Sequence, residues 1–188
     1  MNIAVIGAGN IGGAIGSKWE KAGHHVTYQL RDPEKKKGAV PLGQGLESAD
    51  IILLAVPGKA VVEFVREHSK ALEGKTLIDA TNNPGAPSFN CWHDLLKAAP
   101  GALLYRAFNT YGFEVMGNPE IGGEKADMFY CGPEQDAPIV ERLIEDVGMH
   151  PIRVGGMDAV DTVDGVLRLW FTLSRSRGRR IAFRLITD

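Results

Sequence analysis

The sequence predicts an α/β fold in which helices cover both faces of a doubly wound, mostly parallel sheet. Short apolar runs rich in β-branched residues alternate along the chain with segments whose apolar residues recur at helical spacing. The first of these runs, Ile3–Ile6, has no charged residue and leads directly into a glycine-rich turn and a helix. This order of strand, glycine turn and helix is typical of a Rossmann-type sheet.

Three glycines of that turn, Gly7, Gly9 and Gly12, have the spacing of the dinucleotide fingerprint G-x-G-x-x-G. The first glycine permits the tight turn, the second lets a pyrophosphate approach the backbone, and the third lets the helix pack closely on the strand. The free amides at the start of the helix favour an anion. We therefore expect a dinucleotide phosphate site, for which an ordinary glycine-rich turn is the alternative.

The end of the second predicted strand, residues 25–30, is where a Rossmann-type site distinguishes NAD from NADP. A carboxylate at this position binds the ribose hydroxyls of NAD, whereas arginine accommodates the 2′-phosphate of NADP. Asp32 is followed by proline, so its carboxylate is expected to cap a short helix. Arg31, with Lys35 and Lys36, is then expected at a 2′-phosphate. A solvated run of lysines is the alternative.

Three later predicted strands, 51–56, 75–80 and 102–107, alternate with helices expected at 59–72 and 91–98. Because the carboxyl ends of parallel strands meet at one edge of the sheet, their end residues should line a common ligand crevice. The residues at these strand ends are Val56, Pro57, Thr81, Asn82, Phe108 and Asn109.

We divide the chain into a dinucleotide-binding core, residues 1–110, and a C-terminal extension, residues 111–188, packed on the same sheet as one compact unit. The extension should contain a loop to residue 125, a strand at 126–131, a helix at 133–147, a strand at 150–154 and a helix from residue 157. Three aspartates near the start of that last helix suit its dipole; they are Asp158, Asp161 and Asp164. The arginine-rich tail is either solvated or packed against the domain or a second subunit.

Composition excludes several functional classes for these 188 residues. A net charge of −2 provides no basic field for nucleic acid, and no apolar run approaches the roughly 18 residues of a membrane span. The sequence opens on a core strand without a targeting segment, so we expect a cytoplasmic protein. Cys91 and Cys131 lack the spacing of metal ligands and are expected to be reduced, structural thiols, and no metal site is expected.

Several catalytic motifs are missing from the sequence. It has no G-x-S-x-G elbow, no paired carboxylates with an evident acid–base role and no phosphate loop ending in Gly-Lys-Ser/Thr. We therefore predict an oxidoreductase without a catalytic acid or base, in which the protein supplies proximity and orientation for hydride transfer between two bound cofactors. A non-catalytic NADP(H)-binding sensor and a small imine or ketone reductase are the alternatives.

Segments along nearly the whole chain resemble the F420-dependent NADP oxidoreductases and their bacterial relatives. These segments are Ile3–Gly13, Arg31–Lys35, Ala49–Pro57, Asp79–Asn82, Arg106–Thr110, Met128–Gly132 and Ile181–Leu185. The resemblance implies reversible hydride transfer between NADP(H) and the deazaflavin coenzyme F420 or a flavin.

The resemblance also implies roles for individual residues. Gly7, Gly9, Asn10, Ile11 and Gly12 would contact the pyrophosphate, and Arg31 and Lys35 the 2′-phosphate. Asn109 stands where the archaeal deazaflavin enzymes have histidine. Small-molecule cofactors are the expected partners, and a homodimer is left open.

Overall fold

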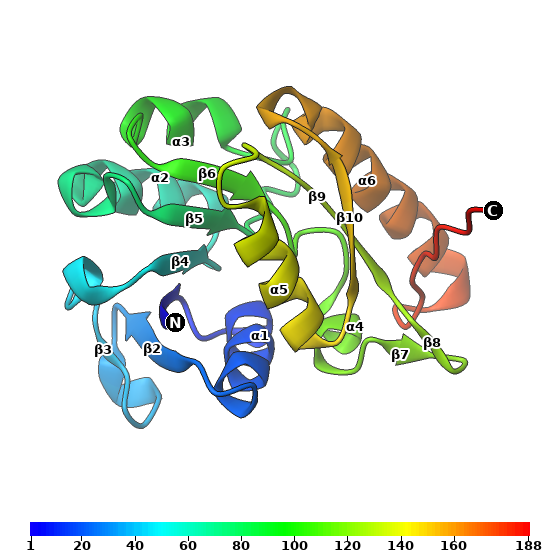
Figure 1. Cartoon of the computed structure of the whole chain (residues 1–188), viewed down its shortest axis with the longest axis horizontal. Coiled ribbons are helices and arrows are strands. Elements are labelled where there is room, and N and C mark those ends of the chain that lie inside the picture. The colour runs from blue at the N-terminus through cyan, green and yellow to red at the C-terminus, as the bar shows by residue number, and fades with distance from the viewer.

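An eight-stranded sheet runs through the computed structural model, which describes residues 1–188 (Figure 1). Its strand order is β10-β9-β6-β5-β4-β1-β2-β3. All neighbouring strands are parallel except β6 and β9, so the predicted doubly wound, mostly parallel sheet is confirmed. The strands are β1 (Asn2–Ile6), β2 (His25–Leu30), β3 (Val40–Pro41), β4 (Ile51–Leu54), β5 (Thr76–Asp79), β6 (Leu103–Arg106), β9 (Asp127–Cys131) and β10 (His150–Gly155).

Helices cover both faces of the sheet (Figure 1). They are α1 (Asn10–Lys21), α2 (Gly58–Glu67), α3 (Trp92–Ala98), α4 (Phe113–Gly117), α5 (Ala137–Val147) and α6 (Val160–Arg177). One apolar cluster joins the sheet to α1, α4 and α5, and a second joins it to α2, α3 and the start of α6. Alternate residues of β1 belong to different clusters, because successive side chains of a strand point to opposite faces.

Several element boundaries differ from those expected. The helix predicted at 59–72 ends at Glu67 and is followed by the short 3-10 turn Ser69–Leu72. The helix predicted from 133 begins at Ala137, because Tyr105 and Thr76 hold Asp136 outside it: the Asp136 N–H donates to the Tyr105 hydroxyl at 3.0 Å, and the Thr76 hydroxyl donates to the Asp136 carboxylate at 2.6 Å.

The segment predicted as a loop, 111–125, contains regular structure. It forms the short helix α4 and a hairpin of β7 (Glu120–Ile121) and β8 (Glu124–Lys125). Gly122 and Gly123, both with positive φ, supply the turn between these strands.

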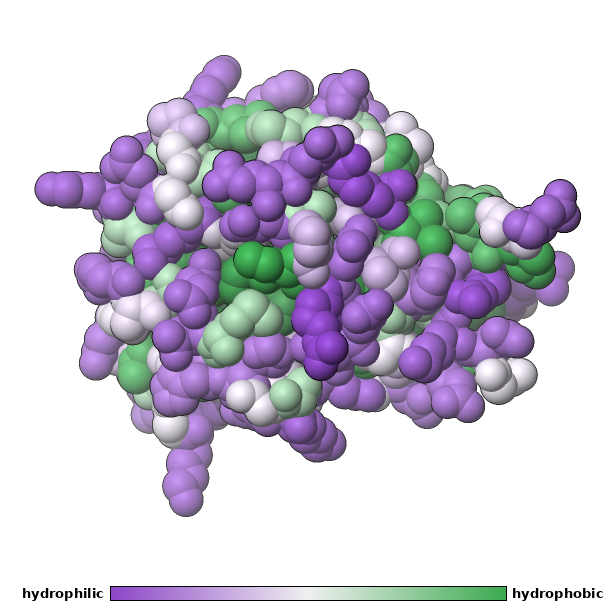
Figure 2. Space-filling model, in the orientation of Figure 1, coloured by the Kyte–Doolittle hydropathy of each residue, from purple (hydrophilic) through white to green (hydrophobic).

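The tail after α6 packs back onto the domain. The indole N–H of Trp170 donates to the Ile181 carbonyl at 2.9 Å, and the Asp127 N–H donates to the Phe183 carbonyl at 3.0 Å. Ile181 and Phe183 lie against the larger apolar cluster, whereas Leu185 and Ile186 are exposed. Figure 2 shows apolar side chains gathered on the surface near this C-terminal end. The tail therefore packs in part against the domain, and the prediction of a wholly solvated tail is wrong.

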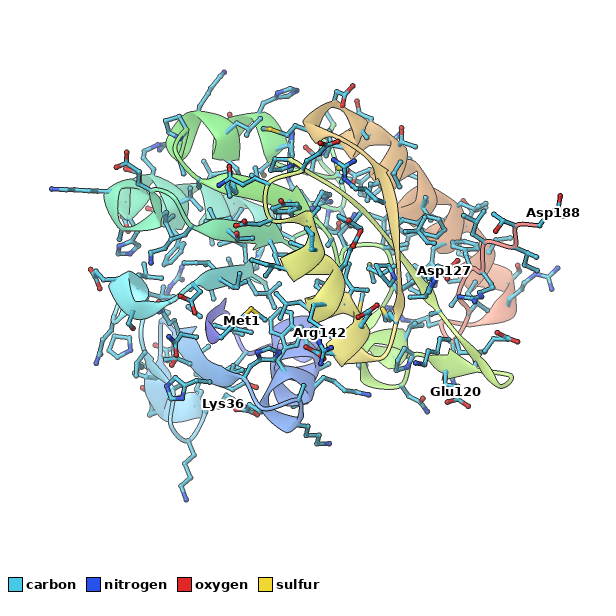
Figure 3. All side chains as sticks on the ribbon, viewed as in Figure 1. Met1, Lys36, Glu120, Asp127, Arg142 and Asp188 are labelled. Atoms are coloured by element: carbon cyan, nitrogen blue, oxygen red, sulfur yellow. The ribbon has the colours of Figure 1, made fainter.

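Two arginines of the tail are paired within the chain, and Asp127, the partner of one of them, is labelled in Figure 3. Arg179 forms an ion pair with Glu114 at 2.6 Å, and Arg184 donates to the Asp127 carboxylate at 2.8 Å. The first of these pairs lowers the pKa of the Glu114 carboxyl. Their charges hold the tail against α4 and β9.

Replacing Phe183 by alanine should lower the free energy of unfolding by about 2 kcal/mol, less than the cost for a fully buried ring, since Phe183 is only partly buried. Ile186→Ala is the matched control, because this side chain is 86% exposed. Urea denaturation of both variants measures the difference. Equal stability of the two would mean that the tail does not contribute to the core.

Candidate nucleotide-binding site

The glycine turn after β1 is closely packed at two of its three glycines. Gly7 has φ +98°, and a Cβ there would lie 2.6 Å from the carbonyl oxygen of Ala55. A Cβ on Gly12 would lie 2.0 Å from the carbonyl oxygen of Gly7. Both positions therefore require glycine if the turn and the helix are to keep this geometry.

Gly9 has a different environment, because no atom lies within 4 Å of the place that its Cβ would occupy. Gly9 is also the N-cap of α1, which has no capping side chain and no acidic residue in its first turn. The first amides of the helix, at Asn10 and Ile11, thus adjoin open space with the positive end of the dipole. This arrangement fits a pyrophosphate.

A cleft of about 560 Å³ opens beside the turn, and we call it the β1–α2 cleft. Its lining residues are Ile6, Gly7, Gln29, Leu30, Arg31, Asp32, Leu42, Val56, Pro57, Ala60, Glu63, Phe64, Glu67 and His68. Gln29 is buried and satisfied at both ends of its amide: it donates to the Gln44 carbonyl at 3.0 Å and accepts from the Gly43 N–H at 2.8 Å. It fixes the loop that closes one side of the cleft.

The three cations predicted at the 2′-phosphate have different surroundings. Arg31 lines the cleft, is exposed and forms no ion pair. The Lys35 ammonium lies 2.6 Å from the Asp32 carboxylate, and this pair lowers the pKa of Asp32 and raises that of Lys35. The Lys36 ammonium lies 4.0 Å from the centre of the Tyr28 ring. Only Arg31 is thus free of a partner within the chain.

Asp32 does occupy the N-cap of a turn, the 3-10 turn Pro33–Lys35, but its carboxylate makes no capping hydrogen bond. The expected cap was wrong because the ammonium of Lys35, three residues on, offers the carboxylate a stronger, charge-assisted partner.

Beyond this cleft, the ends of β5 and β6 surround a fully buried guanidinium, that of Arg106. It contacts Asp79 of β5 at 2.8 Å through Nη1 and Asp164 of α6 at 2.9 Å through Nη2. Nε also donates to Asp164, at 3.0 Å, and Nη1 also donates to the Thr81 carbonyl. We call these side chains, with Asn82 and Asn109, the Arg106 cluster.

Two amides complete the Arg106 cluster. The Asn82 side-chain oxygen accepts from Arg106 at 3.0 Å, and its nitrogen donates to the Asn109 carbonyl at 2.8 Å. The Asn109 nitrogen donates to Asp164 at 3.0 Å, while its Oδ1 is buried without a partner. The cluster joins the ends of two strands to the start of α6.

The predicted crevice residues therefore fall into two groups. Gly7, Arg31, Val56 and Pro57 line the β1–α2 cleft. Thr81, Asn82 and Asn109 instead turn toward the Arg106 cluster.

Phe108, another predicted crevice residue, is buried in a strained conformation. It has φ +61°, the only positive φ of a non-glycine residue, and its ring meets the edge of Trp19 at 5.8 Å between centroids.

Sequence reasoning missed the cluster itself. Asp164 was expected to interact with the helix dipole, yet its carboxylate is buried against Arg106. Asp79 follows Leu77 and Ile78 at the end of its strand, and Arg106 follows Leu104 and Tyr105. A charged residue in such a position indicates a buried partner. That signal does not say which partner.

Other reactive groups do not form a site. Burial raises the pKa of the Cys131 thiol to about 12 and also raises that of Cys91, so neither is a thiolate at neutral pH. Both cysteines are free, and no three His, Cys, Asp or Glu side chains are grouped as metal ligands would be. None of the helices is long and apolar enough to cross a membrane.

Comparison with known proteins bears on the glycine turn and the cleft. Residues 2–83 match the family described as NADP oxidoreductase, coenzyme F420-dependent. A glycerol-3-phosphate dehydrogenase [NAD(P)+] of Ectopseudomonas mendocina is 26% identical over 148 residues, which are 66% of this chain. The chain spans only 41% of that dehydrogenase.

Solved structures share the fold over most of the chain. A candidate F420-dependent NADP-reductase from Arthrobacter sp. FB24 superposes over 100% of both chains, with a TM-score of 0.85 and 19% identity. A protein without assigned function from Sinorhizobium meliloti has a TM-score of 0.73 and 28% identity over 85% of this chain and 87% of its own. A reductive aminase from Aspergillus terreus in complex with NADPH has a TM-score of 0.68 and 23% identity over 92% of this chain and 60% of its own.

These matches confirm the family resemblance and the Rossmann-type fold expected from the sequence. The matched family and the dehydrogenase are NAD(P)-dependent oxidoreductases. The matched segment, residues 2–83, includes the glycine turn and every residue that lines the β1–α2 cleft.

Replacing Arg106 by methionine should lower the free energy of unfolding by about 3 to 5 kcal/mol, because Asp79 and Asp164 would stay buried without their cation. Arg66→Met, at an exposed position on α2 without an ion pair, is the control and should change stability little. Thermal and urea unfolding compare the two. If Arg106→Met lowered the free energy of unfolding no more than Arg66→Met, the ion pairs of the cluster would not stabilise the fold.

Proposed function

We propose that this protein is an NADP(H)-dependent oxidoreductase that transfers hydride between NADPH and a deazaflavin such as coenzyme F420, or a flavin. The observation on which this rests is the unpaired Arg31 in the cleft beside an open, uncapped glycine turn. The family match over residues 2–83 supports the cofactor, and the family description supports the deazaflavin.

The glycine turn is proposed to hold the pyrophosphate. Gly9 leaves room for the phosphates, and the amides of Asn10 and Ile11 would donate to their oxygens. Gly7 and Gly12 act indirectly, since they allow the turn that presents these amides.

The β1–α2 cleft is proposed to hold the adenosine end. Arg31 would bind the 2′-phosphate through two parallel hydrogen bonds, which a guanidinium makes well. Lys35 would join it by exchanging the Asp32 carboxylate for the more highly charged phosphate, a small rearrangement because both side chains are exposed. Val56 and Pro57 would pack against the nucleotide where β4 ends.

The ends of β5 and β6 are proposed to position the nicotinamide and the acceptor. Thr81, Asn82, Phe108 and Asn109 lie there, and the Arg106 cluster holds their backbone in place. The bound nicotinamide supplies or accepts the hydride. The protein's own contribution is orientation, because both buried carboxylates of the cluster are engaged by Arg106 and are not poised to move a proton.

Arg31→Ala should weaken NADPH binding about ten- to a hundredfold, the net value of one charge-assisted hydrogen bond, and should leave NADH binding nearly unchanged. Lys36→Ala is the matched control, because its ammonium lies over Tyr28. Fluorescence titration with both nucleotides measures the effect. Equal losses for NADPH and NADH would remove Arg31 from the 2′-phosphate.

Turnover should depend on the acceptor and hardly on pH. NADPH oxidation followed by absorbance should proceed with coenzyme F420 or FMN, at a rate nearly constant between about pH 6 and 8, since no side chain donates a proton. Binding of NADPH without oxidation by either acceptor would favour a sensor. Oxidation only with a cyclic imine or ketone would favour a carbonyl or imine reductase.

A further inference from the structure

We propose that Glu63 makes the β1–α2 cleft selective for a purine with a 6-amino group, so that the protein distinguishes adenine from hypoxanthine. This inference rests on the proposed function, because it takes the cleft to hold the base of the dinucleotide. It adds a specificity determinant that the binding of phosphates alone does not require.

The walls of the cleft suit a flat base. Six of its 14 lining residues are hydrophobic, and they come from β1, β2, α2 and the loops between them. A purine ring would pack between these side chains, while polar groups at the edge of the cleft would set its orientation.

The position of Glu63 on α2 directs it to the base. Pro57, Ala60, Phe64 and Glu67 also line the cleft, so with Glu63 they form one face of the helix at spacings of three and four residues. At about 1.5 Å per residue, Glu63 is some 8 Å along the helix from its start at Gly58. It therefore lies farther along the cleft than the proposed phosphate site.

Among the acidic side chains that line the cleft, Glu63 differs from Asp32 and Glu67 in its surroundings. Asp32 is paired with Lys35, at 2.6 Å. Glu67 lies one turn further on and also lines a neighbouring surface groove with Glu47 and Lys70. Glu63 forms no ion pair, and it lines this cleft but not the neighbouring groove.

The chemistry of a carboxylate selects one kind of base. An ionised carboxylate only accepts hydrogen bonds, so it can bind the 6-amino group of adenine. We place the carboxylate on the N7 side of the 6-position, where the 6-oxo group of hypoxanthine would set an acceptor against this acceptor. The N1–H donor of hypoxanthine lies on the opposite side, so binding would lose a charge-assisted hydrogen bond. Glutamine at the same position could turn its amide to donate to a 6-oxo group, so it should lose this preference.

The test compares NADPH with its deamino analogue, in which hypoxanthine replaces adenine, by fluorescence titration of the full-length protein. The unmodified protein should bind NADPH about tenfold or more tightly than the analogue. Glu63→Gln should bring the two affinities within about threefold of each other or reverse their order. Glu67→Gln, in the same cleft, and Glu145→Gln, on the exposed side of α5, should keep the original ratio.

The stability of Glu63→Gln and the ratio of the two affinities together test the role of Glu63. Thermal unfolding of Glu63→Gln should match that of the unmodified protein, because Glu63 is exposed and holds no partner. Equal binding of NADPH and the analogue by the unmodified protein, or an unchanged ratio in Glu63→Gln, overturns the role of Glu63 while the proposed function stands. Failure of the unmodified protein to bind either nucleotide overturns the proposed function and this inference with it.

Discussion

The buried guanidinium of Arg106 is the interaction on which the arrangement of the molecule depends. Two carboxylates from distant parts of the chain, Asp79 and Asp164, share this one cation in the interior. Burying two anions against one cation is favourable only with further hydrogen bonds, and Asn82 and Asn109 provide them. Arg106 therefore holds the ends of β5 and β6 against α6, a helix of the C-terminal extension.

The Arg106 cluster and the glycine turn lie at the ends of different strands of one sheet. The turn has no room for side chains at two of its glycines, whereas the cluster is built from side chains. Gly7 and Gly12 leave no space for a side chain, so the backbone itself forms the proposed phosphate site. At the Arg106 cluster the backbone is held by side chains, through contacts such as that of Arg106 with the Thr81 carbonyl. A rigid sheet edge with one open, amide-lined position suits a protein whose proposed contribution to a reaction is orientation.

Charged side chains of opposite sign line different parts of the β1–α2 cleft. Arg31 provides an unpaired cation at the end of β2, whereas Glu63 places an acceptor on α2. The pair of Lys35 with Asp32 lies at the surface, where solvent screens it and makes it easy to exchange. One cleft thus presents a cation from β2 and a hydrogen-bond acceptor from α2.

The sequence by itself determined the sheet, the glycine turn and the edge at which the strands end, because these follow from local spacing. Short apolar runs and the G-x-G-x-x-G pattern depend on neighbours a few residues apart. Only the tertiary structure decided that Asp164 meets Arg106, 58 residues away, that Lys35 takes the Asp32 carboxylate from its cap, and that Phe183 joins the core. A charged or apolar side chain has many possible partners, and close packing across the chain selects one of them.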